Sequence, residues 1–183
     1  QHLELTRDIA HKFNTDFKSD YFKLPDPIID EKAPRIMSLR DANNKMSKSD
    51  VSKYSRILLT DSNDDIATKI SKAKSDSHNM PSDIEGVNNR PEINNLLNIY
   101  AAVSNQDKSE VINQFSGKEI SYFKSELKEV VINLIEPISS GIQDIKDDKT
   151  LLINTLKHGS DKAREIATKT ISDVDNLMGL NIE

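Results

Sequence analysis

Residues 121–138 read SYFKSELKEVVINLIEPI and carry the clearest structural pattern in the chain. Apolar side chains recur in this segment at the 3.6-residue period of an α-helix for about five turns. The segment therefore predicts a long helix with one buried face, which Pro137 should bend or end. The predicted buried face consists of Phe123, Leu127, Val130, Val131, Leu134, Ile135 and Ile138.

The same period predicts three shorter helices between residues 63 and 117. Asn63 and Asp107 are good helix N-caps, and Pro91 suits the first position of a helix. Residues 75–90 form a long polar connection between the first two helices, and a structureless connection of that length is either functional or mobile. The expected core residues of the three helices are Ile66, Ile70 and Ala73, then Ile93, Leu96, Leu97 and Tyr100, then Val111, Ile112 and Phe115.

Helices are also expected near both ends of the sequence. Residues 1–14 have apolar side chains at intervals of four, which predicts an amphipathic helix. Residues 148–158 should form a short helix that stops at Gly159, and Ser160 should cap a last helix. The apolar face of the first helix is expected to be Leu5, Ile9 and Phe13, and that of the last helix Ala163, Ile166, Ala167, Ile171, Val174 and Leu177.

Residues 21–62 differ from the rest of the chain. Three prolines, Pro25, Pro27 and Pro34, interrupt short β-prone runs, so a long helix is not expected there. The runs are residues 27–29, 35–39 and 56–60, and a polar loop at 41–55 separates the last two. A helix followed by strands and a loop is the pattern of the second half of an α/β layer. We therefore expect a mainly α chain whose first 62 residues are the remnant of an α/β domain.

The composition limits the classes of function. The 183 residues contain 25 basic and 30 acidic side chains, which gives a formal net charge of −5 and argues against a uniform basic coat for nucleic acid or anionic membranes. Cysteine is absent, which excludes disulfides, thiolate metal sites and thiol nucleophiles. No apolar run approaches the ~20 residues of a membrane span, and we expect no membrane association. The chain opens at Gln1 without Met, so we expect a piece of a longer protein.

The loop at 41–55 contains the most specific motif, Lys45-Met46-Ser47-Lys48-Ser49. Two ammonium groups interleaved with hydroxyl side chains suit a triphosphate, because Lys is a mobile point charge and Ser donates hydrogen bonds to phosphate oxygens. The alternative is an ordinary solvated loop. Residues 32–56 favour an anion site, since they hold seven basic side chains against two acidic ones. The basic ones are Lys32, Arg35, Arg40, Lys45, Lys48, Lys53 and Arg56.

The motif and four other segments resemble the class I aminoacyl-tRNA synthetases, and most closely the bacterial-type tryptophanyl-tRNA synthetases. The other segments are QHLELTRD at 1–8, RIMSL at 35–39, NLLNIY at 95–100 and MGL at 178–180. The resemblance covers essentially the whole chain but only the C-terminal half of the family's sequence. It implies a C-terminal remnant of a Rossmann-like nucleotide-binding domain at 1–62 and an α-helical anticodon-binding bundle at 63–160. It further implies a terminal helix at 161–183 that packs back toward the first part.

The resemblance implies a tryptophan–tRNA ligase, which uses ATP to activate tryptophan as the adenylate and then transfers it to tRNA(Trp). Lys45 and Lys48 would be catalytic, stabilising negative charge on the leaving phosphates with the help of Mg²⁺. Ile36 and Met46 would flank the adenine. The complete set of nucleotide-binding residues would be Ile36, Lys45, Met46, Ser47, Lys48 and Ser49.

The resemblance also sets limits on this chain. Most of the tryptophan pocket and of the homodimer interface would lie in the half that is absent here, so this chain alone should be inactive. The implied location is the cytoplasm. Relatives commonly have a proline soon after the acid that ends the motif, but here Asp50 is followed by Val51 and Ser52, which predicts a less stiff loop.

Two alternatives stay open. A tyrosyl-tRNA synthetase shares the loop motif, and the choice of amino acid is made in the absent half. A stand-alone helical module that binds RNA or protein without catalysis would have no affinity for a triphosphate.

Other polar residues carry weaker signals. His2 and His11 are nine residues apart, and Asp64 and Asp65 are better read as acids of a first helical turn, so we expect no protein metal site. Arg7 should pair with a loop and not act in catalysis. The candidate contacts to RNA phosphates are Lys69, Lys72, Lys74 and Arg90.

Overall fold

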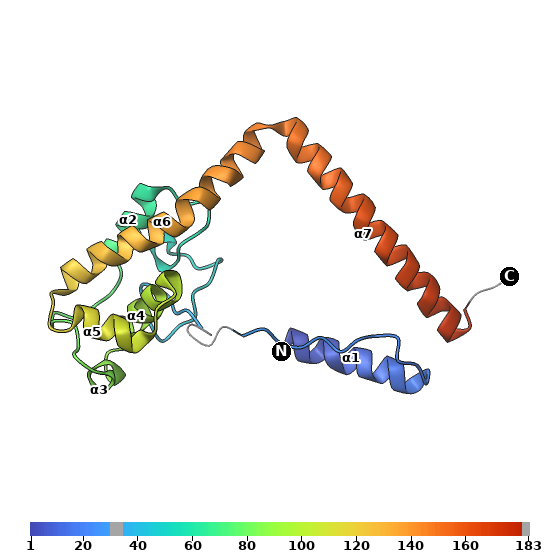
Figure 1. Cartoon of the computed structure of the whole chain (residues 1–183), viewed down its shortest axis with the longest axis horizontal. Helices are drawn as coiled ribbons and strands as arrows, with labels where there is room; N and C mark the ends of the chain where they lie inside the picture. The colour runs from blue at the N-terminus through green and yellow to red at the C-terminus, as the bar shows by residue number, and fades with distance from the viewer. Residues whose placement is uncertain (30–34, 181–183) are drawn as a thin grey trace. The chain divides into compact units, whose positions relative to one another are not determined.

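The computed structural model describes residues 1–29 and 35–180, and within them it is helical (Figure 1). The predicted mainly α fold is confirmed. The elements are α1 (His2–Asp16), the 3₁₀ helix η1 (Lys53–Ser55), α2 (Asn63–Ser71), α3 (Ile84–Asn88), α4 (Pro91–Ser104), α5 (Lys108–Phe115), α6 (Ile120–Asp147) and α7 (Lys149–Met178).

The chain divides into two compact units. The terminal unit combines Gln1–Ile29 with Asp148–Glu183, and the central unit is Asp30–Asp147. Pro34 and Lys32, which entered the predictions above, lie outside the described residues.

The core of the central unit lies between five helices. Helix α6 packs against α2 and α4, and α4 packs against α5 and α3; Figure 1 shows α2 beside α6. The apolar stripes predicted for α2, α4 and α5 are all buried, and each large side chain removed from water contributes about 1.5–3 kcal/mol. Aromatic rings close one end of this core, with Phe115 4.9 Å from Phe123 and 5.1 Å from Tyr100 between ring centroids.

The helix starts follow the predicted chemistry, with one shift. Pro91 occupies the first turn of α4 and Asp107 is the N-cap of α5, as predicted. Asp107 also forms a reciprocal capping box with Glu110. The cap of α2 is Ser62 and not Asn63. The Ser62 hydroxyl accepts from the Asp65 N–H at 3.1 Å and donates to the Asp65 carboxylate at 2.8 Å. Both residue types suit an N-cap, and this reciprocal bond decides between them.

Helix α6 runs past Pro137, so the proline does not end it. A proline in a helix interior removes one hydrogen bond and costs about 3 kcal/mol. The residues of α6 that are buried, Phe123, Leu127, Val131 and Ile135, all precede it and anchor the helix before the proline is reached. The predicted buried face is too wide, because Leu134 and Ile138 are 49% and 41% exposed.

Helix α7 is one continuous helix through Gly159, so the predicted stop at Gly159 and new start at Ser160 are wrong. Glycine in a helix interior costs about 1 kcal/mol relative to alanine, which good helix formers on both sides outweigh. The residue that ends the helix is Gly179, whose φ of +71° is the left-handed conformation that favours glycine. None of the residues of α7 is buried.

The β-prone runs do not form strands in the described part of the chain. Its only β pairing is an isolated antiparallel bridge between Met37 and Lys45. A strand is stable only beside partner strands, and none lies next to residues 27–29 or 56–60 here. Ile28 is fully exposed and Ile29 67% exposed as a result.

Polar contacts and a cluster of aromatic rings, Phe13, Phe17, Tyr21 and Phe22, surround α1 in the terminal unit. Arg7 donates to the Pro25 carbonyl at 2.6 Å and to the Asp26 carboxylate at 2.8 Å, which is the loop pairing predicted for it. The Tyr21 hydroxyl donates to Asp173 of α7 at 3.0 Å. Of the predicted apolar face of α1, Leu5 and Ile9 are 57% and 62% exposed, while Phe13 is half-buried against Phe17 and Phe22.

Candidate nucleotide-binding loop

The loop that contains Lys45 to Ser49 is closed at its base by backbone hydrogen bonds. Ser38 N–H donates to the Asn44 carbonyl at 2.8 Å, and Met46 N–H donates to the Ile36 carbonyl at 3.1 Å. The two ends of the 41–55 loop are joined through Leu39, whose N–H donates to the Ser55 carbonyl at 2.9 Å. The Leu39 carbonyl in turn accepts from Lys74 N–H at 2.7 Å. The base of the motif is therefore a pair of hydrogen-bonded extended segments within the central unit.

A buried amide from α4 completes this base. Asn95 is 3% exposed. Its Oδ1 accepts from Met37 N–H at 2.9 Å, and its Nδ2 donates to the Met37 carbonyl at 2.9 Å. The side chain thus makes the two bonds that a neighbouring strand would make.

The entry to the motif is a turn organised by Asp41. Its Oδ1 accepts from the backbone N–H and side-chain amide of Asn43, both at 3.1 Å, and its Oδ2 accepts from Asn44 at 2.6 Å. Hydrogen bonds to the carboxylate, the backbone bond from Asn43 first, hold the pKa of Asp41 below its usual value. The carboxylate therefore stays ionised and keeps the turn formed.

The exit from the motif is a second turn built on an acid. Asp50 Oδ1 accepts from Ser52 N–H at 2.8 Å, and the Asp50 carbonyl accepts from the Arg56 guanidinium at 2.9 Å. The sequence predicts a less stiff loop here because Asp50 is followed by Val51 and Ser52, and in the structure these hydrogen bonds restrain the turn.

The six predicted nucleotide-binding residues divide into two groups. Lys45, Ser47, Lys48 and Ser49 are exposed, while Ile36 and Met46 are half-buried and pack against the core. The Ser47 and Ser49 hydroxyls lie 3.2 Å apart. Among the described residues, neither Lys45 nor Lys48 forms an ion pair, so both ammonium groups are available to an anion.

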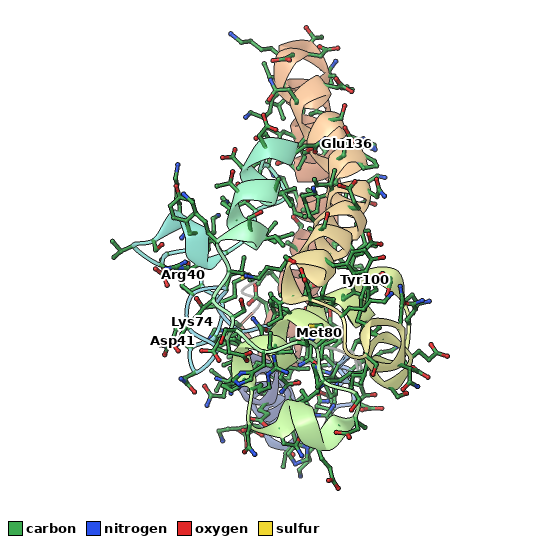
Figure 2. All side chains as sticks on the ribbon, turned by 90° about the vertical axis from the view of Figure 1, so that its left-hand side faces the viewer. Arg40, Asp41, Lys74, Met80, Tyr100 and Glu136 are labelled. Atoms are coloured by element: carbon green, nitrogen blue, oxygen red, sulfur yellow. The ribbon has the colours of Figure 1, made fainter. Side chains whose placement is uncertain are left out.

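The other cations near the loop have structural partners. Arg40 donates to the Lys72 carbonyl at 2.5 Å, and Lys124 of α6 donates to the Ala73 carbonyl at 2.7 Å. Both bonds satisfy carbonyls at the C-terminus of α2, where positive charge is favoured. Desolvation, with a smaller contribution from Arg40, lowers the pKa of Lys124. In Figure 2, Arg40, Asp41 and Lys74 lie on one side of the central unit.

Lys69 and Arg90, two of the four predicted RNA contacts, have ion-pair partners within the protein. Lys69 is wrong as a surface contact, because its ammonium is buried in an ion pair with Asp61. Arg90 binds Asp76 through two nitrogens at 2.7 Å each and donates to the Asn79 carbonyl at 2.8 Å. These bonds, with α3, give residues 75–90 a defined fold in place of the structureless connection predicted.

The remaining two candidates lie at the surface. Lys74 pairs with Glu92 at 2.8 Å, and Lys72 lies over the Tyr54 ring at 4.4 Å. Both side chains are exposed.

Residues 1–29 and 35–180 contain neither a metal site nor a membrane span. No group of three or more His, Cys, Asp or Glu side chains in this part is placed to hold a metal ion. No helix in the same residues is both long enough and apolar enough to cross a bilayer.

Comparisons with known proteins assign the chain to a family of tRNA synthetases. The family described as tRNA synthetases class I (W and Y) matches residues 1–136. Tryptophan–tRNA ligase of Caulobacter vibrioides is 46% identical over 98% of this chain and 52% of its own length. The Agrobacterium fabrum tryptophan–tRNA ligase is 42% identical over 98% of this chain and 56% of its own length. The chain thus spans about half the length of the curated relatives it matches.

Solved structures show the same fold. Tryptophanyl-tRNA synthetase from Mycoplasma pneumoniae is 28% identical, with a TM-score of 0.82 over 98% of this chain and 53% of its own. The Campylobacter jejuni enzyme complexed with ADP and tryptophan is 24% identical, with a TM-score of 0.64 over 97% of this chain and 53% of its own. The family match covers the loop, its base and the helices that hold it, and the chain belongs to the class I tRNA synthetases of the tryptophan and tyrosine group.

Proposed function

We propose that this chain is part of a tryptophan–tRNA ligase. The whole enzyme would activate tryptophan with ATP and transfer it to tRNA(Trp). The observation that carries the proposal is the Lys45–Ser49 loop, whose two ammonium groups are exposed above a base tied to α2 and α4. The names of the similar proteins favour tryptophan over tyrosine.

The loop would act on the phosphates of ATP. Attack of the tryptophan carboxylate on the α-phosphate releases pyrophosphate, so negative charge grows on the β- and γ-phosphates in the transition state. Lys45 and Lys48 would neutralise that charge, and the Ser47 and Ser49 hydroxyls would donate hydrogen bonds to phosphate oxygens. Mg²⁺ would supply further charge neutralisation. The motif offers ammonium and hydroxyl groups and no carboxylate, so it suits the phosphates and not the metal itself.

Ile36 and Met46 would contact the adenine. Each is half-buried against the core, so part of its apolar surface stays accessible beside the loop. An adenine ring lying on that surface would be shielded from water on one face.

We assign a separate role to each of three consecutive parts of the chain. Residues 1–62 would belong to the nucleotide-binding domain, 63–160 to the anticodon-binding bundle and 161–183 to a helix returning to the first part. The bond from Tyr21 to Asp173 supports that return. The boundary at residue 62 lies within the compact central unit, since Met37 and Leu39 are bonded to α4 and to the end of α2.

The tryptophan pocket and a homodimer interface would lie mostly in sequence that the relatives have and this chain lacks. The enzyme would work in the cytoplasm, and this chain alone would be inactive.

The test is ATP–pyrophosphate exchange with the full-length protein and each of the twenty amino acids. Exchange should depend on tryptophan, and the 183-residue chain alone should show none. Activation of tyrosine would replace the proposal with a tyrosyl-tRNA synthetase. Absence of exchange with every amino acid, in a protein that binds RNA, would replace it with a helical binding module.

A further inference from the structure

We propose that Asn95 is the positioning residue of the nucleotide loop: its amide fixes the backbone of Met37, and Met37 fixes Lys45. This inference rests on the proposed function, because it assigns Asn95 a role in placing a lysine that acts on ATP.

The contact geometry links the three residues in a row. On one side Met37 exchanges two hydrogen bonds with the Asn95 amide, both at 2.9 Å. On the other side Met37 forms the antiparallel bridge with Lys45, closed by the bonds between Ser38 and Asn44 and between Met46 and Ile36. The backbone of Met37 therefore lies between the Asn95 side chain and the backbone of Lys45.

Asn95 is suited to define a position because it is buried on a helix whose neighbouring side chains are packed in the core. Its neighbours on α4, Ile93, Leu96 and Leu97, are at most 1% exposed. An amide at such a site is costly unless both its oxygen and its nitrogen find partners. Here the two shortest bonds go to Met37, and a longer one of 3.5 Å runs from Nδ2 to the Ser38 carbonyl. All three exist together only when Met37 and Ser38 are in one register.

Leu39, two residues after Met37, is held by bonds that do not involve Asn95. Leu39 is fixed by backbone bonds to Ser55 and Lys74, which a substitution of Asn95 leaves in place. Loss of the Asn95 amide should therefore release the Ile36–Met37 end and the register of Lys45, while the remainder of the central unit keeps its fold.

The test is a double-mutant cycle in the full-length enzyme, measured as the single-turnover rate of adenylate formation and the KM for ATP. Asn95→Asp keeps an acceptor for Met37 N–H but faces the Met37 carbonyl with a second oxygen. It should slow the reaction about 10- to 100-fold, as misplacement of a reacting group does. Asn98→Asp, on the same helix and half-buried, is the matched control and should change the rate less than about twofold.

The cycle separates positioning from stability. In a Lys45→Ala background, Asn95→Asp should cause little further loss, because its effect passes through Lys45. Multiplicative losses would overturn the positioning role and leave Asn95 a structural residue. If Lys45→Ala alone left the rate unchanged, the proposed function of the loop would fail instead, so the two failures are distinguishable.

A second measurement covers the case in which Asn95→Asp does not fold at the assay temperature. In the unsubstituted enzyme, hydrogen exchange at Met37 N–H should be as slow as at the buried amides of α4. Exchange as fast as at the exposed residues of the motif would overturn the proposal.

Discussion

Lys69 and Asp61 form an ion pair inside the core of the central unit, with side chains only 6% and 10% exposed. The same Asp61 oxygen accepts from Leu58 N–H at 2.8 Å, so the pair fastens the turn that precedes α2 onto the helix itself. Removing one member of such a pair leaves an uncompensated charge in an apolar surrounding.

Lys69→Met should therefore destabilise the protein by about 3 kcal/mol in urea unfolding. Lys72→Met, three residues away and exposed, is the control and should cost less than about 1 kcal/mol. The double variant Lys69→Met with Asp61→Leu should recover most of the loss, since it removes both charges. A loss below that of the control would mean that the pair contributes nothing.

Lys48→Ala in the full-length enzyme should lower the rate of tryptophan activation about 100-fold, as removal of one transition-state donor does. The KM for ATP should change little, because the charge that Lys48 meets develops only as pyrophosphate leaves. Stopped-flow adenylate formation measures both quantities, with Lys128→Ala on α6 as control. Collapsed ATP binding with an intact maximal rate would contradict the transition-state role.

Asp76→Asn should lower stability by about 1 kcal/mol at pH 7, after allowance for partial exposure. The hydrogen bond from Arg90 is the main cause that holds the pKa of Asp76 below its ordinary value. A carboxylate with a depressed folded-state pKa adds stability above its unfolded-state pKa, and loses it as pH falls through the folded value. The difference between variant and parent should therefore shrink below about pH 4. A difference that grows on acidification would refute the assignment, and exposed Asp144→Asn serves as reference.

Gly159→Ala should raise stability by about 1 kcal/mol, because Gly159 lies in the interior of α7 with open space around it. Gly179→Ala should lower stability by about 1 kcal/mol, because an alanine at φ +71° is strained. Thermal unfolding followed by circular dichroism compares the two signs. If Gly159→Ala were destabilising, α7 would be broken at the position where the sequence first suggests a stop.

The sequence predicts local chemistry better than the length of helices. Pro91, the Asp107 box and the stripes of α2, α4 and α5 follow from rules that act within a few residues, and all are found. Pro137 and Gly159 fail as stops because a penalty of about 1–3 kcal/mol is small beside the summed preference of a 28- or 30-residue helix.

In the candidate site, too, local sequence rules predict some residues and miss those whose partners are distant in sequence. The motif is visible as a string, and the exposure of Lys45 and Lys48 agrees with it. Asn95 and Asp61 are invisible to local rules, because their partners lie 58 and 8 residues away. A partial signal exists for Lys69 and Asn95, since each interrupts a buried helical stripe with a polar residue that must find a partner there.

The bond between Tyr21 and Asp173 has a consequence for the order in which the protein is assembled. The terminal unit is made from residues on both sides of the central unit in sequence, so the Tyr21–Asp173 bond waits for the 30 residues of α7, which the ribosome adds in about 2 to 6 seconds. The central unit is continuous in sequence and is complete before α7 begins. The nascent chain therefore carries a finished core, loop base included, before Tyr21 can meet its partner on α7.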